Sequence, residues 1–275
     1  MVGASNKKVG NVECGGEWIM TSTNENIENI YFTKNIINYP LTLSATTITA
    51  SPGQTVYIQQ NGSYIQYQIN STTGSWTNIT FPVTIINSNP SIQRVTVSLA
   101  TNITLTAANQ YFIIGSNLIT VDGSIYTVTI GSSVTDYPGF VQNLSYSGIS
   151  VSNINMKCTT STLAGNGGWV GQSGTINTNF YKCSSDGIIG QTGTIFTGGG
   201  IVGSSTSYVT VENCWSSGQI TGYDVNRGSG GIVGLSCVNA IISNCYSTGN
   251  IGLFGGGILG SFANGFLIDH CYSLG

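Results

Sequence analysis

Residues 199–203 read GGIVG, and ten residues later the chain continues from Cys214 as CWSSGQI. This two-part motif occurs in three clear copies and in one looser copy whose glycine pair starts at Gly167. The leading glycines lie at positions 167, 199, 230 and 256, so the period is 26 to 32 residues, which is typical of solenoid proteins. The repeated positions of the clear copies are Gly199, Gly200, Ile201, Gly203 and Cys214, then Gly230, Gly231, Ile232, Gly234 and Cys245, then Gly256, Gly257, Ile258, Gly260 and Cys271.

The residues before each cysteine alternate between apolar and polar types, as in residues 209–214, VTVENC. No segment has the longer period of an amphipathic helix. Short strands joined by glycines cannot bury an apolar face alone, so each copy has to stack on the next one, at a spacing of about 4.8 Å. The sequence therefore predicts an all-β parallel β-helix, with one internal ladder of the repeated isoleucines and another of the repeated cysteines. The glycine pairs are expected at its corners, where positive φ and close approach are needed.

The motif G-G-[IW]-V-G followed by N-C-[YW]-S-x-G-x-I resembles the GLUG repeat, which is found in bacterial surface proteins and in proteins of large DNA viruses. The resemblance covers roughly residues 165–275. It implies a right-handed β-helix with a scaffold or adhesin-like role, and it carries over no catalytic residues. Residues 111–123 also resemble the coils of pectate-lyase-like β-helices, in which an apolar strand and a polar turn are followed by an Asp-Gly corner.

The chain divides by composition into three parts. Residues 1–28 are the most charged part of the chain and are predicted to form an N-terminal arm or cap. Residues 29–137 read as short strands and are expected to form irregular coils of the same solenoid or a separate β domain, and residues 138–275 are expected to form the regular repeats. Because the sequence stops at Gly275 within a repeat, we expect either a longer protein or a C-terminal end that docks on another subunit.

Charged residues make up only 6% of the 275 residues, whereas about a quarter is usual. The chain has seven Lys and Arg residues and a net charge of −3, which argues against a nucleic-acid partner. No apolar run of about 20 residues is present, so no membrane span is expected. A polar but uncharged surface suits fibres, virus particles and glycan-facing proteins. The first residues also lack a secretory signal, which favours synthesis in a host cytoplasm.

The seven cysteines do not form an obvious disulfide framework, because their number is odd and their spacing follows the repeat. Free buried thiols that pack as small apolar groups are predicted, with oxidation between neighbouring coils as the alternative. Cys158 lies 25 residues before Cys183 and is predicted to begin the cysteine ladder.

Candidate catalytic groups are few. Glu212 and Asp269 each lie two residues before a repeat cysteine, so they share a face of the solenoid, with Ser243 between them. Their expected separation is two coils, near 9.6 Å, whereas the two carboxyl groups of a glycosidase lie about 5 to 9.5 Å apart. The favoured interpretation is that both are solvent-facing strand residues without a catalytic role. His270 is expected to point outward, away from Cys271. Neither a metal site nor a cofactor site is predicted.

We therefore expect a structural or adhesive β-helix, a fibre or surface component of a virus particle that associates with itself and binds a glycan or host receptor. Outward tyrosines such as Tyr208, Tyr246 and Tyr272 suit sugar binding, although packing against the repeat is the favoured alternative. The rival functions are a polysaccharide depolymerase or lyase and a fragment of a bacterial adhesin at the cell surface. Catalytic activity is not expected, although the sequence leaves it open.

Overall fold

The computed structural model describes residues 19–20, 25–26, 45–158, 161–190, 196–222, 224 and 227–275. Its internal contacts divide the chain into two units, Met1–Thr46 and Thr47–Gly275. In the first unit, β1 (Ile19–Met20) pairs with β2 (Glu25–Asn26) in an antiparallel manner. The rest of the predicted N-terminal arm or cap lies outside the described residues.

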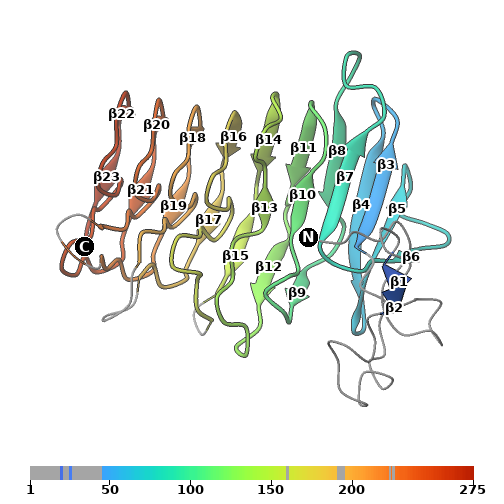
Figure 1. Ribbon diagram of the computed structural model, residues 1–275, viewed down its shortest axis with the longest axis horizontal. Coiled ribbons are helices and arrows are strands. Elements are labelled where there is room, and N and C mark those ends of the chain that lie inside the picture. The colour runs from blue at the N-terminus through green and yellow to red at the C-terminus, as the bar shows by residue number, and fades with distance from the viewer. Residues whose placement is uncertain are drawn as a thin grey trace. The chain divides into compact units, whose positions relative to one another are not determined.

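The second unit consists of short strands that stack in three sheets (Figure 1). The first sheet contains β3 (Thr46–Ala50), β7 (Val83–Asn87), β10 (Phe112–Ile114) and β13 (Val141–Gln142). The second contains β4 (Thr55–Asn61), β8 (Val95–Leu99), β11 (Ile119–Asp122), β14 (Ile149–Ser152), β16 (Thr178–Tyr181), β18 (Thr210–Glu212), β20 (Ile241–Ser243) and β22 (Leu267–Asp269), and it ends with β5 (Tyr64–Ile69) and β6 (Thr77–Asn78). The third contains β9 (Ile103–Leu105), β12 (Thr127–Ile130), β15 (Asn155–Lys157), β17 (Ser184–Ser185), β19 (Trp215–Ser216), β21 (Tyr246–Ser247) and β23 (Tyr272–Ser273).

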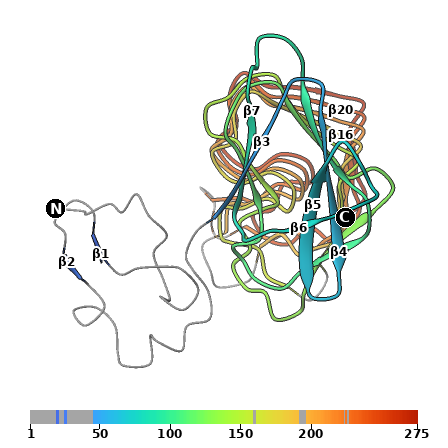
Figure 2. The same cartoon turned by 90° about the vertical axis from the view of Figure 1, so that its right-hand side faces the viewer.

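The chain visits these sheets in the same order in successive coils, and equivalent strands of neighbouring coils pair in parallel. Viewed along the stack, the coils lie behind one another (Figure 2). The described residues contain no helix. The predictions of an all-β chain and of a parallel β-solenoid are therefore confirmed. No helix that could cross a membrane was found among the described residues.

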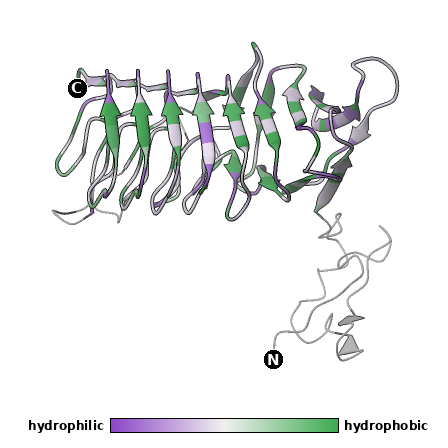
Figure 3. Ribbon diagram, turned by 90° about the horizontal axis from the view of Figure 1, so that it is seen from above, coloured by the Kyte–Doolittle hydropathy of each residue, from purple (hydrophilic) through white to green (hydrophobic). Residues whose placement is uncertain are grey.

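Alternating side chains explain why these strands form. In β8 the apolar residues Val95, Val97 and Leu99 are buried, whereas Thr96 and Ser98 are partly exposed on the outer side. The paired strands place one apolar residue of each coil directly above the next along the second sheet, and Figure 3 shows apolar residues in successive strands. This central apolar ladder comprises Val56, Val97, Val121, Val151, Phe180, Val211, Ile242 and Ile268.

Left-handed residues form the corners between the second and third sheets. Asn153, Lys182, Asn213, Asn244 and His270 lie at equivalent places and have φ values of 54°, 52°, 55°, 52° and 48°. Asparagine is common there because its short polar side chain tolerates this conformation. The expectation that the glycine pairs supply positive φ at corners was wrong, since the positive-φ glycines do not include them.

The glycine pairs are instead places where neighbouring coils approach closely. A Cβ atom on Gly200 would lie 2.7 Å from the Cβ atom of Ser216 and would overlap the carbonyl oxygen of Gly231 in the next coil. Such a contact excludes any larger residue unless the backbone moves.

The N-terminal edge of the second sheet is covered by antiparallel strands. β5 pairs with β4 along its length, and β6 pairs with β5. The edge of β4 therefore does not present a free row of backbone groups, which would otherwise invite pairing with another chain.

Candidate functional site

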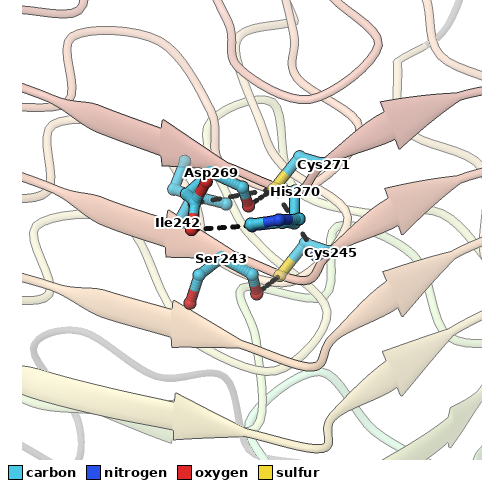
Figure 4. A network of polar contacts seen from close by, with 6 residues as sticks. All are labelled: Ile242, Ser243, Cys245, Asp269, His270 and Cys271. Atoms are coloured by element: carbon cyan, nitrogen blue, oxygen red, sulfur yellow. Dashed lines mark hydrogen bonds and ion pairs between the residues drawn. The ribbon is translucent and has the colours of Figure 1, made fainter.

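The repeat places four cysteines at one register position, and we call them the thiol ladder: Cys183, Cys214, Cys245 and Cys271. The backbone N–H of each donates to the Sγ atom of the next, at 3.3 Å for the first pair and 3.4 Å for the other two. Figure 4 shows the last pair, in which both thiols also contact backbone carbonyls of the preceding strands. The ladder residues carry free thiols, as do Cys158 and Cys237.

Cys158 does not begin this ladder, contrary to the prediction. Asn155 pairs with Ser184, so Cys183 is level with Ile154, and Cys158 lies further along its coil. Its backbone N–H donates to Asp186 Oδ1 at 2.7 Å. Burial raises the pKa of the Cys158 thiol well above 9.0, and the negative charge of Asp186 raises it further.

A serine ladder accompanies the thiols two residues further along each coil, and it was missed in the sequence. Ser185, Ser216 and Ser247 are fully buried, with relative exposures of 0%. Their hydroxyls donate to the carbonyl oxygens of Gly200, Gly231 and Gly257 at 2.6, 2.5 and 2.5 Å. The sequence does contain a signal for this ladder, because a serine stands two residues after the cysteine in each of the four copies.

These hydrogen bonds connect the two halves of the repeat motif. The second glycine of each pair supplies the acceptor for a buried hydroxyl, which would otherwise be left without a partner at a cost of about 1–3 kcal/mol. The cysteine-x-serine segment and the glycine pair are thus parts of one structural device.

The two candidate acids lie on the outer side of the second sheet. Glu212 pairs with Ser243, which pairs with Asp269, so the carboxylates are two coils apart, or about 9.6 Å at the usual strand spacing. Asp269 Oδ2 lies 2.8 Å from Nδ1 of His270, and Glu212 Oε1 accepts a hydrogen bond from Asn213 at 3.2 Å. The structure does not bring the two carboxylates together.

His270 belongs to a corner and points away from the thiol of Cys271. Its side chain is 76% exposed, and its ion pair with Asp269 is visible in Figure 4. Among the residues that the structure describes, no group of three or more His, Cys, Asp and Glu side chains could hold a metal ion.

Aromatic side chains form a stacked row on the outer side of the third sheet. The ring of Trp215 stacks on Tyr246 with a centroid distance of 6.1 Å and an interplanar angle of 7°, and Tyr246 stacks on Tyr272 at 5.2 Å and 6°. Tyr246 therefore has an aromatic ring on each of its two faces, whereas Trp215 and Tyr272 each stack through one face in this row. Tyr208 is exposed separately, at a left-handed corner.

The last coil exposes side chains that its predecessors bury. Ile242 of the central apolar ladder is fully buried, whereas Ile268 in the same position is 38% exposed. Leu267 lies on the outer side of the second sheet, where its partner Ile241 is exposed as well. We call the exposed apolar residues of this coil the C-terminal face: Leu253, Phe254, Phe262, Phe266, Leu267, Ile268 and Leu274.

Three comparisons with known proteins were made with this chain. No family model, no curated protein and no solved structure matches it. The resemblance to GLUG repeats therefore stays a prediction that rests on the motif itself.

Proposed function

We propose that this protein is a structural and adhesive scaffold, a fibre or surface component of a virus particle. The observation that carries the proposal is the unbroken register of coils, in which apolar, thiol and serine ladders all run along one axis. Such a stack is rigid and elongates by adding coils, which suits a load-bearing or ligand-presenting part. Assignment to a virus particle is supported by the GLUG-like motif and by the polar, uncharged composition.

The chemistry of the described surface supports a scaffold better than an enzyme. The carboxylates of Glu212 and Asp269 are about two coils apart, and their polar partners are a neighbouring Asn and His. Glycoside hydrolysis needs two carboxyl groups about 5 to 9.5 Å apart across a bound sugar. The separation of Glu212 and Asp269 lies at the outer limit of that range.

We also propose that copies of the protein associate through the C-terminal face. This face exposes large apolar side chains, among them Leu253 at 77%, Leu274 at 72% and Phe262 at 62%. Large apolar side chains that are exposed together in one coil suit a protein interface. With charged residues at 6% of the chain, there is also little electrostatic repulsion between copies.

Sedimentation velocity over a range of protein concentrations tests this proposal. We expect the wild-type protein to form larger species as its concentration rises, and the double variant Phe262→Ser, Leu267→Ser to remain monomeric. Ile92→Ser is the matched control, because Ile92 is 67% exposed but lies far from the last coil in the sequence. A wild-type protein that stays monomeric throughout would refute self-association.

An assay with polysaccharides tests the scaffold role against the enzyme role. The protein is incubated with neutral and acidic polysaccharides, and reducing ends and unsaturated products are measured. We expect neither product to exceed the blank. Release of either one, abolished by Glu212→Gln or Asp269→Asn, would replace the scaffold with a depolymerase or lyase.

A further inference from the structure

A pocket lies on the outer side of the second sheet, near its N-terminal end. Its volume is about 380 Å³, within the range of about 300–1,000 Å³ that is usual for small-ligand sites. Three aromatic side chains and four neutral polar side chains provide the groups that matter for recognition. We call this site the aromatic pocket, and these residues are Tyr57, Trp76, Tyr126, Gln59, Thr72, Ser98 and Ser124.

The floor of the pocket is built by two paired strands. Tyr57 and Gln59 point outward from β4, on either side of the buried Ile58. Tyr57 pairs with Ser98 of β8, so the phenol ring and the serine hydroxyl are neighbours on the same face. Regular strand pairing therefore fixes the floor.

One wall is a tight turn that follows β11. The backbone N–H of Ser124 donates to Asp122 Oδ1 at 3.2 Å, and the N–H of Tyr126 donates to the carbonyl of Gly123 at 3.0 Å. Asp122 Oδ1 also accepts hydrogen bonds from Ser152 and Asn153 of the next coil, at 3.1 and 2.8 Å. The next coil thus holds the turn that carries Ser124 and Tyr126.

The opposite wall is the connection between β5 and β6, which carries Trp76. The connection starts at Asn70, which exchanges two hydrogen bonds with Thr55 of β4, at 2.7 and 2.9 Å. In its middle, the carbonyl of Thr73 accepts a hydrogen bond from Gln68 Nε2 at 2.8 Å. Trp76 immediately precedes β6, whose Thr77 pairs with Tyr67. The wall is therefore anchored at both ends, and Trp76 needs little reorganisation to bind a ligand.

The chemistry of the lining selects the ligand. Among the described residues that line the pocket, none carries a carboxylate, ammonium, guanidinium or imidazole group, so a charged ligand would lose its hydration without gaining a partner there. Ser and Gln side chains both donate and accept hydrogen bonds, as sugar hydroxyls do. Tyr and Trp rings combine an apolar body with a polar edge and suit the apolar C–H faces of a sugar ring.

We propose that the aromatic pocket binds an uncharged saccharide. This inference rests on the adhesive part of the proposed function and deepens it by naming a site and a ligand class. Proline-rich peptides also bind aromatic grooves, but they depend on a few hydrogen bonds to backbone carbonyls. A lining with four hydroxyl or amide side chains among three rings favours a ligand that carries many hydroxyls.

Isothermal titration calorimetry with defined oligosaccharides tests the proposal. The neutral probes are maltohexaose, cellohexaose, xylohexaose and mannohexaose, and the contrasting probes are an oligogalacturonate and a decaproline peptide. We expect at least one neutral probe to bind, and Trp76→Ala to weaken its binding at least tenfold, which corresponds to about 1.4 kcal/mol. Trp215→Ala is the matched control, because Trp215 is a partly buried tryptophan of the third sheet, and it should leave binding unchanged.

A second variant guards against a Trp76→Ala protein that does not fold. Ser98→Glu places a carboxylate on the floor of the pocket at an outward strand position, and it should abolish binding while circular dichroism remains that of the wild type. The proposal is overturned if no neutral probe binds, if only the decaproline or the oligogalacturonate binds, or if both pocket variants bind as the wild type does. The self-association measured by sedimentation is independent of this pocket, so a failure here leaves the scaffold proposal standing.

Discussion

Replacing Gly231 with alanine should break the contact between two coils. A Cβ atom at this position would lie 2.8 Å from Ser247 Cβ and would overlap the carbonyl oxygen of Gly257. Gly257 belongs to the next coil, and a Cβ atom essentially never lies within 3.0 Å of another heavy atom, so the two coils would have to separate by roughly 1 Å. The same carbonyl of Gly257 accepts the hydroxyl of Ser247, so the movement also strains a buried hydrogen bond.

The magnitude follows from two opposing effects. Overpacking a tight interior costs about 1–3 kcal/mol, and here the atom that is met is backbone oxygen, which places the cost near 3 kcal/mol. Alanine also stiffens the unfolded chain, which contributes about 0.4–1 kcal/mol in the opposite direction. We therefore expect Gly231→Ala to lower the free energy of unfolding by about 2–3 kcal/mol.

Urea unfolding followed by circular dichroism measures this loss, and hydrogen exchange with mass spectrometry locates it. Gly252→Ala is the control, since its Cβ would lie 3.2 Å from the side-chain hydroxyl of Thr221 and 3.4 Å from the nearest backbone atom. We expect that variant to change stability by less than about 1 kcal/mol. Equal stabilities of the two variants would refute the argument that the repeat glycines are required by close approach.

Three further predictions concern single side chains. Lys182 has a φ of 52° at a corner where three of the four other coils have asparagine, so Lys182→Asn should raise stability by about 0.5–1 kcal/mol in urea unfolding, and a loss would contradict this. Ser216→Ala should lower it by about 1 kcal/mol, because a buried carbonyl loses its hydroxyl donor, and an unchanged midpoint would count against that role. Because burial raises the pKa of the Cys158 thiol, this group contributes stability that is fully present below pH 9.0, the ordinary thiol value, and is lost as the pH rises above it. The free energy of unfolding, measured from pH 7 to 10, should therefore fall less steeply with pH for Cys158→Ala than for the wild type. Identical slopes would refute this.

The repeat motif was sufficient to predict the solenoid because its spacing is constant where coils contact one another. The alternation of apolar and polar residues also predicted that Glu212 and Asp269 lie on one face of the solenoid, two coils apart, as they do. The position of Cys158 could not be derived in this way. Its 25-residue distance from Cys183 resembles a repeat period, but loops of variable length shift the register before the regular copies begin.

Other features depend on contacts that no local pattern reveals. The role of Ser216 becomes apparent only when Gly231 of the next coil is placed against it. The aromatic pocket is formed by Tyr57, Trp76 and Tyr126, which come from a strand, a connection and a turn in the irregular coils. No repeat relates these residues, so their proximity is a property of the folded chain.

Methyl NMR spectroscopy tests the central claim, that equivalent residues of successive coils lie directly above one another. With labelled Val and Ile methyl groups, Ile242 should show nuclear Overhauser contacts with both Val211 and Ile268, its neighbours at about 4.8 Å along the stack. Val211 and Ile268 lie two spacings apart, at about 9.6 Å, and should show no contact or a much weaker one. Absence of both Ile242 contacts, or a contact between Val211 and Ile268 as strong as either of them, would contradict the stacked solenoid.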